Sequence, residues 1–545
     1  MGGELRVVWS IAFLYLLTAC GDDDGPGNTP DARPPVDSGG SPDASDGATP
    51  RDAGRDAIAD AGPEPGDAGG PPPLDVVWEP CFGGGRDAEC ADIAVPLDWD
   101  DPSSATLTLF VKRFVVPDST GQIWLLHGGP GLNARGFENA LDLIMAVAPG
   151  LDVYLVDHRG GGASTPLSCP QLEDVTDLSA LTEADFAGCV EHLLETQPDL
   201  LRATTPTAAG HDLAALIATV REPGDRVVVY GSSYGTYWAH RYLQLYPDQP
   251  DAVVLDGACD PATCGDWLLY EQEHDRLGRA ELAACAADTD CAAHLTPTPE
   301  AFVSALRDGA TFVCPEAFPA VPSPVRLAGL LMERTIGRRY LGPFFYRYAR
   351  CTEADRTAIV NLQRSAFPLS TMTFGPGWAV SFAQVSFAMH PPATVEDALA
   401  FEATASFSKG NGLWMARAGT VWPLPEPDPL NATYADTDVP ILILNGEDDP
   451  QTTAEQARAF AQGLERSNHY YVELPHTLHG AVRSSETAAS LRGEEPPCGA
   501  QVMASFLASP ETAPDTSCMA DIVAPRIAGT PEENMAILGV PDAWD

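Results

Sequence analysis

The stretch VVVYGSSYGTYWAHRYL, residues 227–243, joins an apolar β-branched run directly to a pattern typical of a helix. Between the two lie Ser232 and Ser233, flanked by Gly231 and Gly235. This segment matches the pattern G-x-S-x-G, in which the central serine occupies a tight strand-to-helix turn. Such a turn lifts the hydroxyl of that serine above the sheet, beside the N–H groups of the helix N-terminus. We therefore expect Ser233 to be a nucleophile and Ser232 to face away from the site.

Similar junctions recur on both sides of this segment. Apolar runs end at glycine-rich turns in GQIWLLHGGPG (121–131) and LDVYLVDHRGGG (151–162), and another run follows in DAVVLDGA (251–258). Apolar strands that alternate with helices are typical of a mostly parallel α/β sheet with helices on both faces. The alternation stops for about 180 residues and resumes with VPILILNGEDDP (439–450) and NHYYVELPHTLHG (468–480). Helix-like segments fill the gap, which predicts a mainly helical lid inserted into one α/β domain.

The N-terminal part of the chain has a different composition from the rest. Arg6 precedes an apolar run, Val7–Leu17, that suits the core of a signal peptide. The run ends in Leu-Thr-Ala-Cys, a bacterial lipobox pattern that predicts lipidation of Cys20; the alternative is an ordinary secretory leader. The predicted organisation is a signal peptide (1–20), a disordered acidic Pro/Gly/Asp-rich tether (21–75), a first core part (76–260), a helical lid (261–435) and a second core part with a cysteine-framed C-terminal region (436–545).

Charge and cysteine content restrict the environment of the protein. A formal net charge of −46 makes nucleic acid a poor partner, because binding phosphates requires a basic face. Apart from Cys20, twelve cysteines remain, an even number that favours disulfides over a metal site in an exported protein. We expect no metal and no cofactor. The chain is expected in the bacterial cell envelope, lipid-anchored or secreted, and its oligomeric state is left open.

Close spacing suggests five disulfides and leaves one further pair, although spacing alone does not prove connectivity. The suggested pairs are Cys81–Cys90, Cys169–Cys189, Cys259–Cys264, Cys285–Cys291 and Cys498–Cys518, with Cys314–Cys351 left by elimination.

A serine nucleophile needs a base and an acid that orients the base. For this fold the chain order is Ser, then Asp or Glu, then His. Asp448 and Asp449 follow one of the resumed strands, and His476 and His479 follow the next. His479 is favoured because Gly480 follows it in a loop that can reach Ser233, and His476 is the rival.

Several ordered motifs resemble one family. HGGPG (127–131), DHRGGGAS (157–164), GSSYGT (231–236), NGEDDPQT (445–452) and a terminal LHG are similar to the α/β-hydrolase family of proline iminopeptidases. They most resemble its secreted branch of tripeptidyl aminopeptidases, and CADIAVPLDW near the start and the cysteine-framed tail support this. The resemblance extends roughly from Val76 to Ile522.

The resemblance implies roles for particular residues. The acid of the family is the aspartate directly before proline, here Asp449 rather than Asp448. The backbone N–H groups of Gly129 and Tyr234 would form the oxyanion hole. Two positions depart from the family pattern: Thr453 replaces a proline, and PHTLHG lacks the usual glycine before the histidine loop.

The expected function is a serine exopeptidase that releases short peptides or single residues from free N-termini through an acyl-enzyme on Ser233. An aminopeptidase must bind a protonated amine, and Glu271, Glu273 and Glu333 are the available lid carboxylates, with none singled out. The alternative is an esterase or lipase with the same triad. A third hypothesis, a non-catalytic surface binding module, conflicts with the intact set of triad residues.

Overall fold

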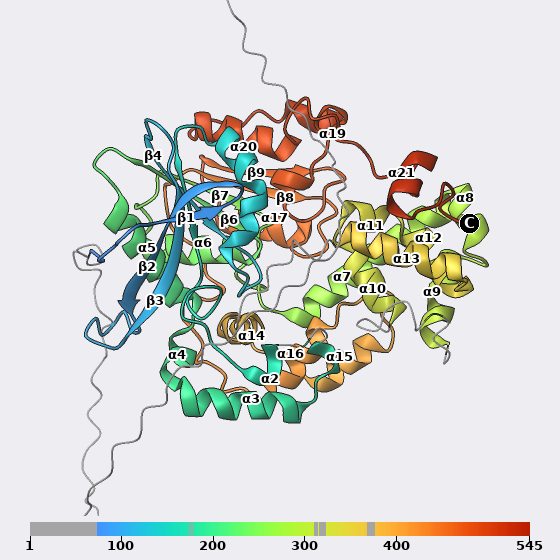
Figure 1. Ribbon diagram of the computed structural model, residues 1–545, viewed down its shortest axis with the longest axis horizontal. Helices are drawn as coiled ribbons and strands as arrows, with labels where there is room; N and C mark the ends of the chain where they lie inside the picture. The colour runs from blue at the N-terminus through green and yellow to red at the C-terminus, as the bar shows by residue number, and fades with distance from the viewer. Residues whose placement is uncertain (1–72, 174, 176–177, 310–313, 315–322, 368–376) are drawn as a thin grey trace, which may run out of the picture. The chain divides into compact units, whose positions relative to one another are not determined.

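Within the described residues, 73–173, 175, 178–309, 314, 323–367 and 377–545, the computed structural model contains a nine-stranded sheet (Figure 1). All of them belong to one unit, Gly70–Asp545. The strands are β1 (Glu79–Gly83), β2 (Arg86–Pro96), β3 (Thr106–Phe114), β4 (Gly121–Leu126), β5 (Asp152–Val156), β6 (Arg226–Ser232), β7 (Ala252–Asp256), β8 (Ile441–Gly446) and β9 (His469–Leu474).

The strand order is β1-β2-β3-β5-β4-β6-β7-β8-β9. Pairing is antiparallel from β1 through β3 to β5 and parallel from β5 to β9. The parallel part places the carboxyl ends of β4, β6, β7, β8 and β9 at one edge of the sheet. The expected mostly parallel sheet is confirmed, with an antiparallel extension formed by the first three strands.

Helices cover both faces of the sheet, as expected. Alternate residues of β6, β7 and β8 pack on α5, α6 and α17 on one face and on α1, α18 and α20 on the other, because successive strand residues point to opposite sides. The helices of these layers are α1 (Leu141–Val147), α2 (Pro170–Glu173), α3 (Glu183–Thr196), α4 (Pro198–Ala203), α5 (Pro206–Val220), α6 (Tyr234–Leu245), α17 (Ala454–Gly463), α18 (Ala481–Ser484), α19 (Ala488–Leu491) and α20 (Cys498–Ala508). Short 3-10 helices lie at Ala134–Ala140, Leu178–Ala180 and Ser517–Asp521.

The chain between β7 and β8 is helical in its regular parts, and we call its helices the cap. They are α7 (Trp267–Ala287), α8 (Thr289–His294), α9 (Pro299–Asp308), α10 (Pro324–Met332), α11 (Thr335–Arg339), α12 (Leu341–Arg350), α13 (Glu353–Ala366), α14 (Trp378–Met389), α15 (Val395–Glu402) and α16 (Asn411–Gly419). Side chains from α7, α8, α9, α10, α12 and α13 form a hydrophobic cluster separate from the two clusters of the sheet.

The C-terminal segment packs on the cap rather than on the sheet. Helix α21 (Pro531–Ile537) contacts α13, and the two lie beside each other in Figure 1. Leu538, Ala543 and Trp544 join the hydrophobic cluster of the cap. Arg347 of α12 fixes the segment by donating hydrogen bonds to three of its backbone carbonyls, at residues 542, 543 and 545.

All six suggested disulfide pairings are confirmed. Their Cα atoms lie 5.3 to 5.8 Å apart, within the range that a disulfide can bridge. The predicted signal peptide, the lipidation site Cys20 and nearly all of the predicted tether lie outside the described residues. Among the helices that the structure describes, none combines the length and the apolar character needed to cross a bilayer.

Candidate active site

Ser233 sits in a strained turn between β6 and α6. Its backbone has φ 59° and ψ −127°, a conformation that a non-glycine residue adopts only where its surroundings enforce it. The Ser233 N–H donates to the carbonyl of Asp256 at the end of β7, 2.9 Å away. The Ser233 carbonyl accepts from the N–H and the hydroxyl of Thr236, at 2.8 and 2.6 Å. Hydrogen bonds on both sides of the residue therefore hold the strained turn.

The glycine after the serine permits this turn because α6 approaches β4 very closely. A Cβ atom on Gly235 would lie 2.1 Å from the carbonyl oxygen of Leu126, far inside van der Waals contact. Only a residue without a side chain allows this approach, which seats the N-terminus of α6 at the end of β4.

The glycine-rich loop after β4 lies directly beside Ser233. A Cβ atom on Gly128 would be 2.7 Å from the Ser233 Cβ and 3.1 Å from its hydroxyl oxygen. Gly129 is the next residue of this loop, and Tyr234 is the first residue of α6. The backbone N–H groups of Gly129 and Tyr234 have no hydrogen-bond acceptor within the described residues. Two free donors thus flank the serine.

Asp449 follows β8, and its carboxylate is completely buried. One carboxylate oxygen accepts the N–H groups of Gln451 and Thr452, at 2.8 and 3.0 Å. The other accepts from the Thr452 hydroxyl at 3.0 Å and lies 2.8 Å from Nδ1 of His479. Hydrogen-bond donors therefore surround both oxygens and fix the carboxyl group against one side of the imidazole.

The neighbouring charges control the protonation of His479. Burial opposes the charged imidazole, but Asp449 and, to a smaller extent, Asp256 and Glu333 together outweigh it, and the pKa of His479 is raised. With Nδ1 bonded to Asp449, the other ring nitrogen, Nε2, is left to act as a base.

Ser233 and His479 lie at the same edge of the sheet, because Ser233 contacts Asp256 and His479 contacts the next residue, Gly257. The carbonyl of Asp256 binds the Ser233 N–H, and a Cβ atom on Gly257 would lie 2.9 Å from Cε1 of His479. The Ser233 hydroxyl makes no hydrogen bond within the described residues. Serine–histidine contacts commonly tighten when substrate binds.

The structure places the rival acid and base elsewhere. The Asp448 carboxylate pairs with Arg338 of α11, at 2.9 Å. His476 is exposed, and its backbone N–H contacts Glu447. Geometry therefore joins Asp449 to His479 and leaves Asp448 and His476 outside this pair.

The three candidate lid carboxylates have different environments. Glu271 is fully buried, and both of its oxygens accept backbone N–H groups, from Lys409 at 2.9 Å and Asn411 at 2.7 Å. Glu273 pairs with Arg276 one turn along α7. Glu333, at the end of α10, binds both Lys409 and the Tyr270 hydroxyl through a single oxygen. Burial opposes its ionisation, but the charges of Lys409 and His274 lower the pKa of Glu333 to about 2.

Sequence reasoning missed several residues around the site. Thr452, which contacts both Asp449 and His479, lies within a matched motif. Asp256 is the buried last residue of the apolar strand β7, and a carboxyl at the end of an apolar run was a signal available in the sequence. Burial raises the pKa of Asp256, and its carboxylate accepts the Tyr230 hydroxyl at 2.6 Å. Lys409 is one of only two lysines in the chain.

Residues of the DHRGGG motif make buried contacts that support the segments around the site. The Asp157 carboxylate accepts the N–H groups of Ala134 and Ala163, at 2.6 and 2.8 Å, and so fixes the start of the segment after the glycine-rich loop. Arg159 is completely buried and pairs with Asp212 at 2.5 Å.

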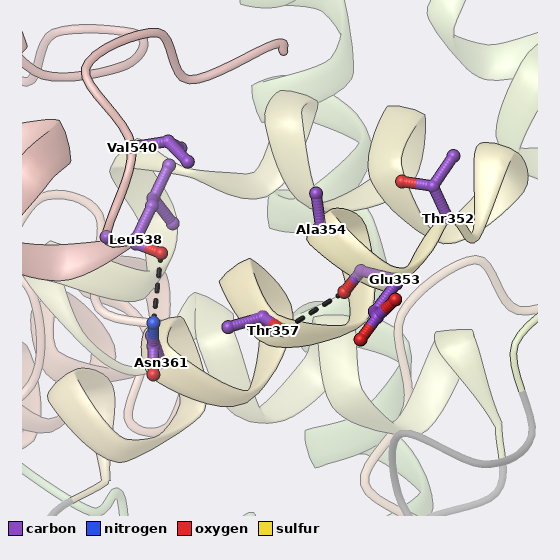
Figure 2. Close-up of a pocket in the computed structure, with 8 residues that line it drawn as sticks. Thr352, Glu353, Ala354, Thr357, Asn361, Leu538 and Val540 are labelled. Carbon is purple, nitrogen blue, oxygen red and sulfur yellow. Dashed lines mark hydrogen bonds between the residues drawn. The ribbon is translucent and has the colours of Figure 1, made fainter.

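A cavity of about 580 Å³ lies away from this site, between α13 and the C-terminal segment (Figure 2). Its lining residues are Thr352, Glu353, Ala354, Thr357, Asn361, Leu538, Gly539 and Val540. Asn361 spans one side by donating a hydrogen bond to the carbonyl of Leu538, and none of the triad candidates lines it. No cluster of three or more metal-ligating side chains occurs within the described part of the chain.

Comparison with known proteins agrees with the fold. Residues 123–279 match the α/β hydrolase fold family, and residues 410–518 match the family described as TAP-like protein. The protein is an α/β hydrolase. Its C-terminal region is TAP-like, and the chain is a homologue of tripeptidyl aminopeptidases, so the resemblance seen in the motifs is confirmed.

Three relatives illustrate the relationship. Tripeptidyl aminopeptidase from Streptomyces coelicolor is 25% identical over 74% of this chain and 80% of its own length. Serine protease Hip1 from Mycobacterium tuberculosis is 27% identical over 34% of this chain, and the match spans 40% of that relative. Carboxylesterase B from M. tuberculosis is 32% identical over 32% of this chain and 37% of its own length.

Replacement of Asp449 tests the source of the His479 charge. In Asp449→Asn the burial penalty is no longer outweighed, so the pKa of His479 should fall below its ordinary value of about 6.5. Histidine-selective isotope labelling and NMR titration measure this shift. The exposed His476 is the internal control, and its titration should not change. An unchanged or raised pKa of His479 would show that Asp449 is not the dominant charge.

Proposed function

We propose that the protein is a serine hydrolase that cleaves peptides from a free N-terminus. The observation that carries the proposal is the buried Asp449–His479 pair at the same sheet edge as the strained Ser233. Asp449 fixes the Nδ1–H tautomer, and His479 Nε2 removes the hydroxyl proton as Ser233 Oγ attacks the substrate carbonyl. The tetrahedral intermediate collapses to an acyl-enzyme when His479 protonates the leaving amine. Water, activated by the same histidine, then releases the acyl group and regenerates Ser233.

The oxyanion of this intermediate would lie between the N–H groups of Gly129 and Tyr234. The close contact of Gly128 with Ser233 and the position of Tyr234 at the N-terminus of α6 support this assignment. One such donor typically contributes about 3 kcal/mol to transition-state stabilisation.

We assign the substrate ammonium to Glu333. Glu271 is unsuitable, since both of its oxygens already accept backbone N–H groups, and Glu273 pairs with Arg276. Glu333 keeps one oxygen without a donor among the described residues, remains ionised, and contributes to the electrostatic field at His479. An ammonium bound there would lie near the reacting groups, as an exopeptidase requires.

An esterase with the same triad is the second candidate. The pairing of Lys409 with Glu333 favours it, because a carboxylate that is already neutralised attracts a substrate amine less strongly. The similarity to carboxylesterase B also fits this candidate.

We further propose export and lipid anchoring at Cys20. Six disulfides indicate an oxidising compartment outside the cytoplasm. The apolar run and the lipobox pattern before Cys20 support attachment to a membrane.

Matched chromogenic substrates test the catalytic proposal. Peptide anilides of one to three residues with free N-termini should be hydrolysed, blocked ones should not, and Ser233→Ala should lose about a thousandfold or more in kcat/KM. Simple acyl esters are assayed alongside. Cleavage of esters without any anilide would establish the esterase instead, and inertness toward both substrates and a serine-directed phosphonate would rule out a serine hydrolase.

Replacement of Glu333 tests the amine anchor. Glu333→Gln should lower kcat/KM for free-amine anilides about 10- to 100-fold through KM and affect acyl esters much less, since an ester has no ammonium that loses its charged partner. Glu273→Gln is the matched control. Equal effects of Glu333→Gln on esters and anilides would assign Glu333 a structural role.

Fatty-acid labelling tests the anchor. In a bacterial host that exports the protein, an alkyne fatty acid should label the wild type and the control Ser10→Ala, which leaves the lipobox intact, whereas Cys20→Ser should remain unlabelled because it lacks the acceptor thiol. Labelling of Cys20→Ser would exclude Cys20 as the lipidation site.

A further inference from the structure

Two side chains of the cap hold the residues on either side of the proposed catalytic acid. We call Glu447–Thr453, which contains Asp449, the acid loop. Arg338 of α11 pairs with Asp448 at 2.9 Å, and Nδ1 of His274 on α7 lies 3.2 Å from the carbonyl oxygen of Pro450. The cap therefore contacts the acid loop immediately before and immediately after Asp449.

Arg338 is a buried bridge between cap and core. Only 8% of its side chain is exposed, and it also pairs with Glu281 of α7 at 2.6 Å. Burial disfavours the charged guanidinium, but the carboxylates of Glu281 and Asp448 raise the pKa of Arg338. A shielded, charge-assisted contact of this kind resists displacement more than an exposed ion pair does.

His274 fixes the other side of the acid loop. Its ring is completely buried, and its Nε2 lies 2.8 Å from the carbonyl of Gly329 on α10. The ring also stacks on Tyr270, whose hydroxyl binds Glu333. Helices α7, α10 and α11 thus converge on the acid loop.

The core holds the acid loop differently. The backbone N–H of Glu447 donates to the last residue of β9 at 2.9 Å, that of Asp448 donates to the segment after β9 at 3.0 Å, and Asn445 donates to the carbonyl of Thr452 at 2.9 Å. These bonds hold the backbone of the loop, and contacts from the cap add to them at its centre, through the Asp448 side chain and the Pro450 carbonyl. Asp449 and His479 lie on separate segments, so a small shift of that centre changes their separation directly.

We propose that Arg338 and Asp448 are a positioning pair through which the cap sets the Asp449–His479 geometry. The inference rests on the proposed serine-hydrolase function and adds a role for the cap beyond covering the substrate. A misplacement of about 1 Å at a catalytic group can reduce the rate about 100-fold, so one ion pair at this position can affect the reaction strongly.

Kinetics separate positioning from simple stabilisation. Arg338→Met should lower kcat for a small acyl ester about tenfold and change KM less than twofold, because the proposed role of Arg338 is to hold the acid loop and not the substrate. Arg338→Lys should restore part of the rate. The kcat of Asp448→Asn should match that of Arg338→Met. The double variant should be no slower than either single variant, since both substitutions remove the same Arg338–Asp448 contact.

The pH profile provides a second readout. His479 faces Asp449, Asp256 and Glu333, with His127 also nearby, and only Asp449 lies on the acid loop. If Asp449 shifts, its carboxylate supports the imidazolium less, so the acid limb of kcat/KM should move to lower pH in Arg338→Met. NMR titration of His479 measures the same shift without requiring activity, so it decides the proposal even if the wild type hydrolyses neither substrate.

The matched control is Arg350→Met, which removes an ion pair to Asp355 confined to α12 and α13. It should leave kcat and the pKa of His479 unchanged. The proposal is overturned if Arg338→Met and Asp448→Asn behave like Arg350→Met, or if the two single effects multiply. Should Arg338→Met fail to fold by circular dichroism, Asp448→Asn, which keeps the shape of the side chain, decides alone.

Discussion

The backbone contact between α6 and β4 is the constraint on which the rest of the site depends. Because Gly235 touches the carbonyl of Leu126, the chain must reverse within one residue, and that residue is Ser233. The same contact brings the N–H of Tyr234 beside the glycine-rich loop and lets Asp256 accept the Ser233 N–H. The strain at φ 59° is therefore offset by hydrogen bonds from two neighbouring elements, β7 and α6, and the serine cannot relax without disrupting the end of the sheet.

Electrostatic balance is the second organising feature of the site. The chain is strongly acidic, and Asp449, Asp256 and Glu333 all act on His479. Each carboxyl has a different partner: backbone and hydroxyl donors for Asp449, the Tyr230 hydroxyl for Asp256, and Lys409 for Glu333. Burial of like charges at this density is tolerated only because every one of them is hydrogen-bonded.

Local sequence patterns predicted the sheet, its inserted helices, five of the six disulfides and the choice of His479, whereas the choice of Asp449 over Asp448 came from the resemblance to a family. Such features depend on short windows, since G-x-S-x-G, the apolar runs and the close cysteine spacings each involve neighbours in the chain. The partners of Glu333 and Asp448 were not predictable in this way. Lys409 lies 76 residues from Glu333, and no periodicity relates Arg338 to Asp448. Similarly, the sequence offers Glu271 as a candidate to bind the substrate amine. Only the fold shows that its carboxylate accepts the backbone N–H groups of Lys409 and Asn411 at the start of α16.

The packing of the C-terminal segment on the cap constrains the order in which the parts of the molecule can fold. All nine strands precede residue 475, yet the hydrophobic cluster of the cap includes Trp544, stacked on His294, and Leu538. Because the chain is synthesised from its N-terminus, its strands can pair before the C-terminal segment completes the hydrophobic cluster of the cap. The bond from Arg347 to the Ala543 carbonyl joins residues 196 apart, and it can form only after the end of the chain has been synthesised. During synthesis, the sheet edge that bears Ser233 would exist for a time beneath an unfinished cap.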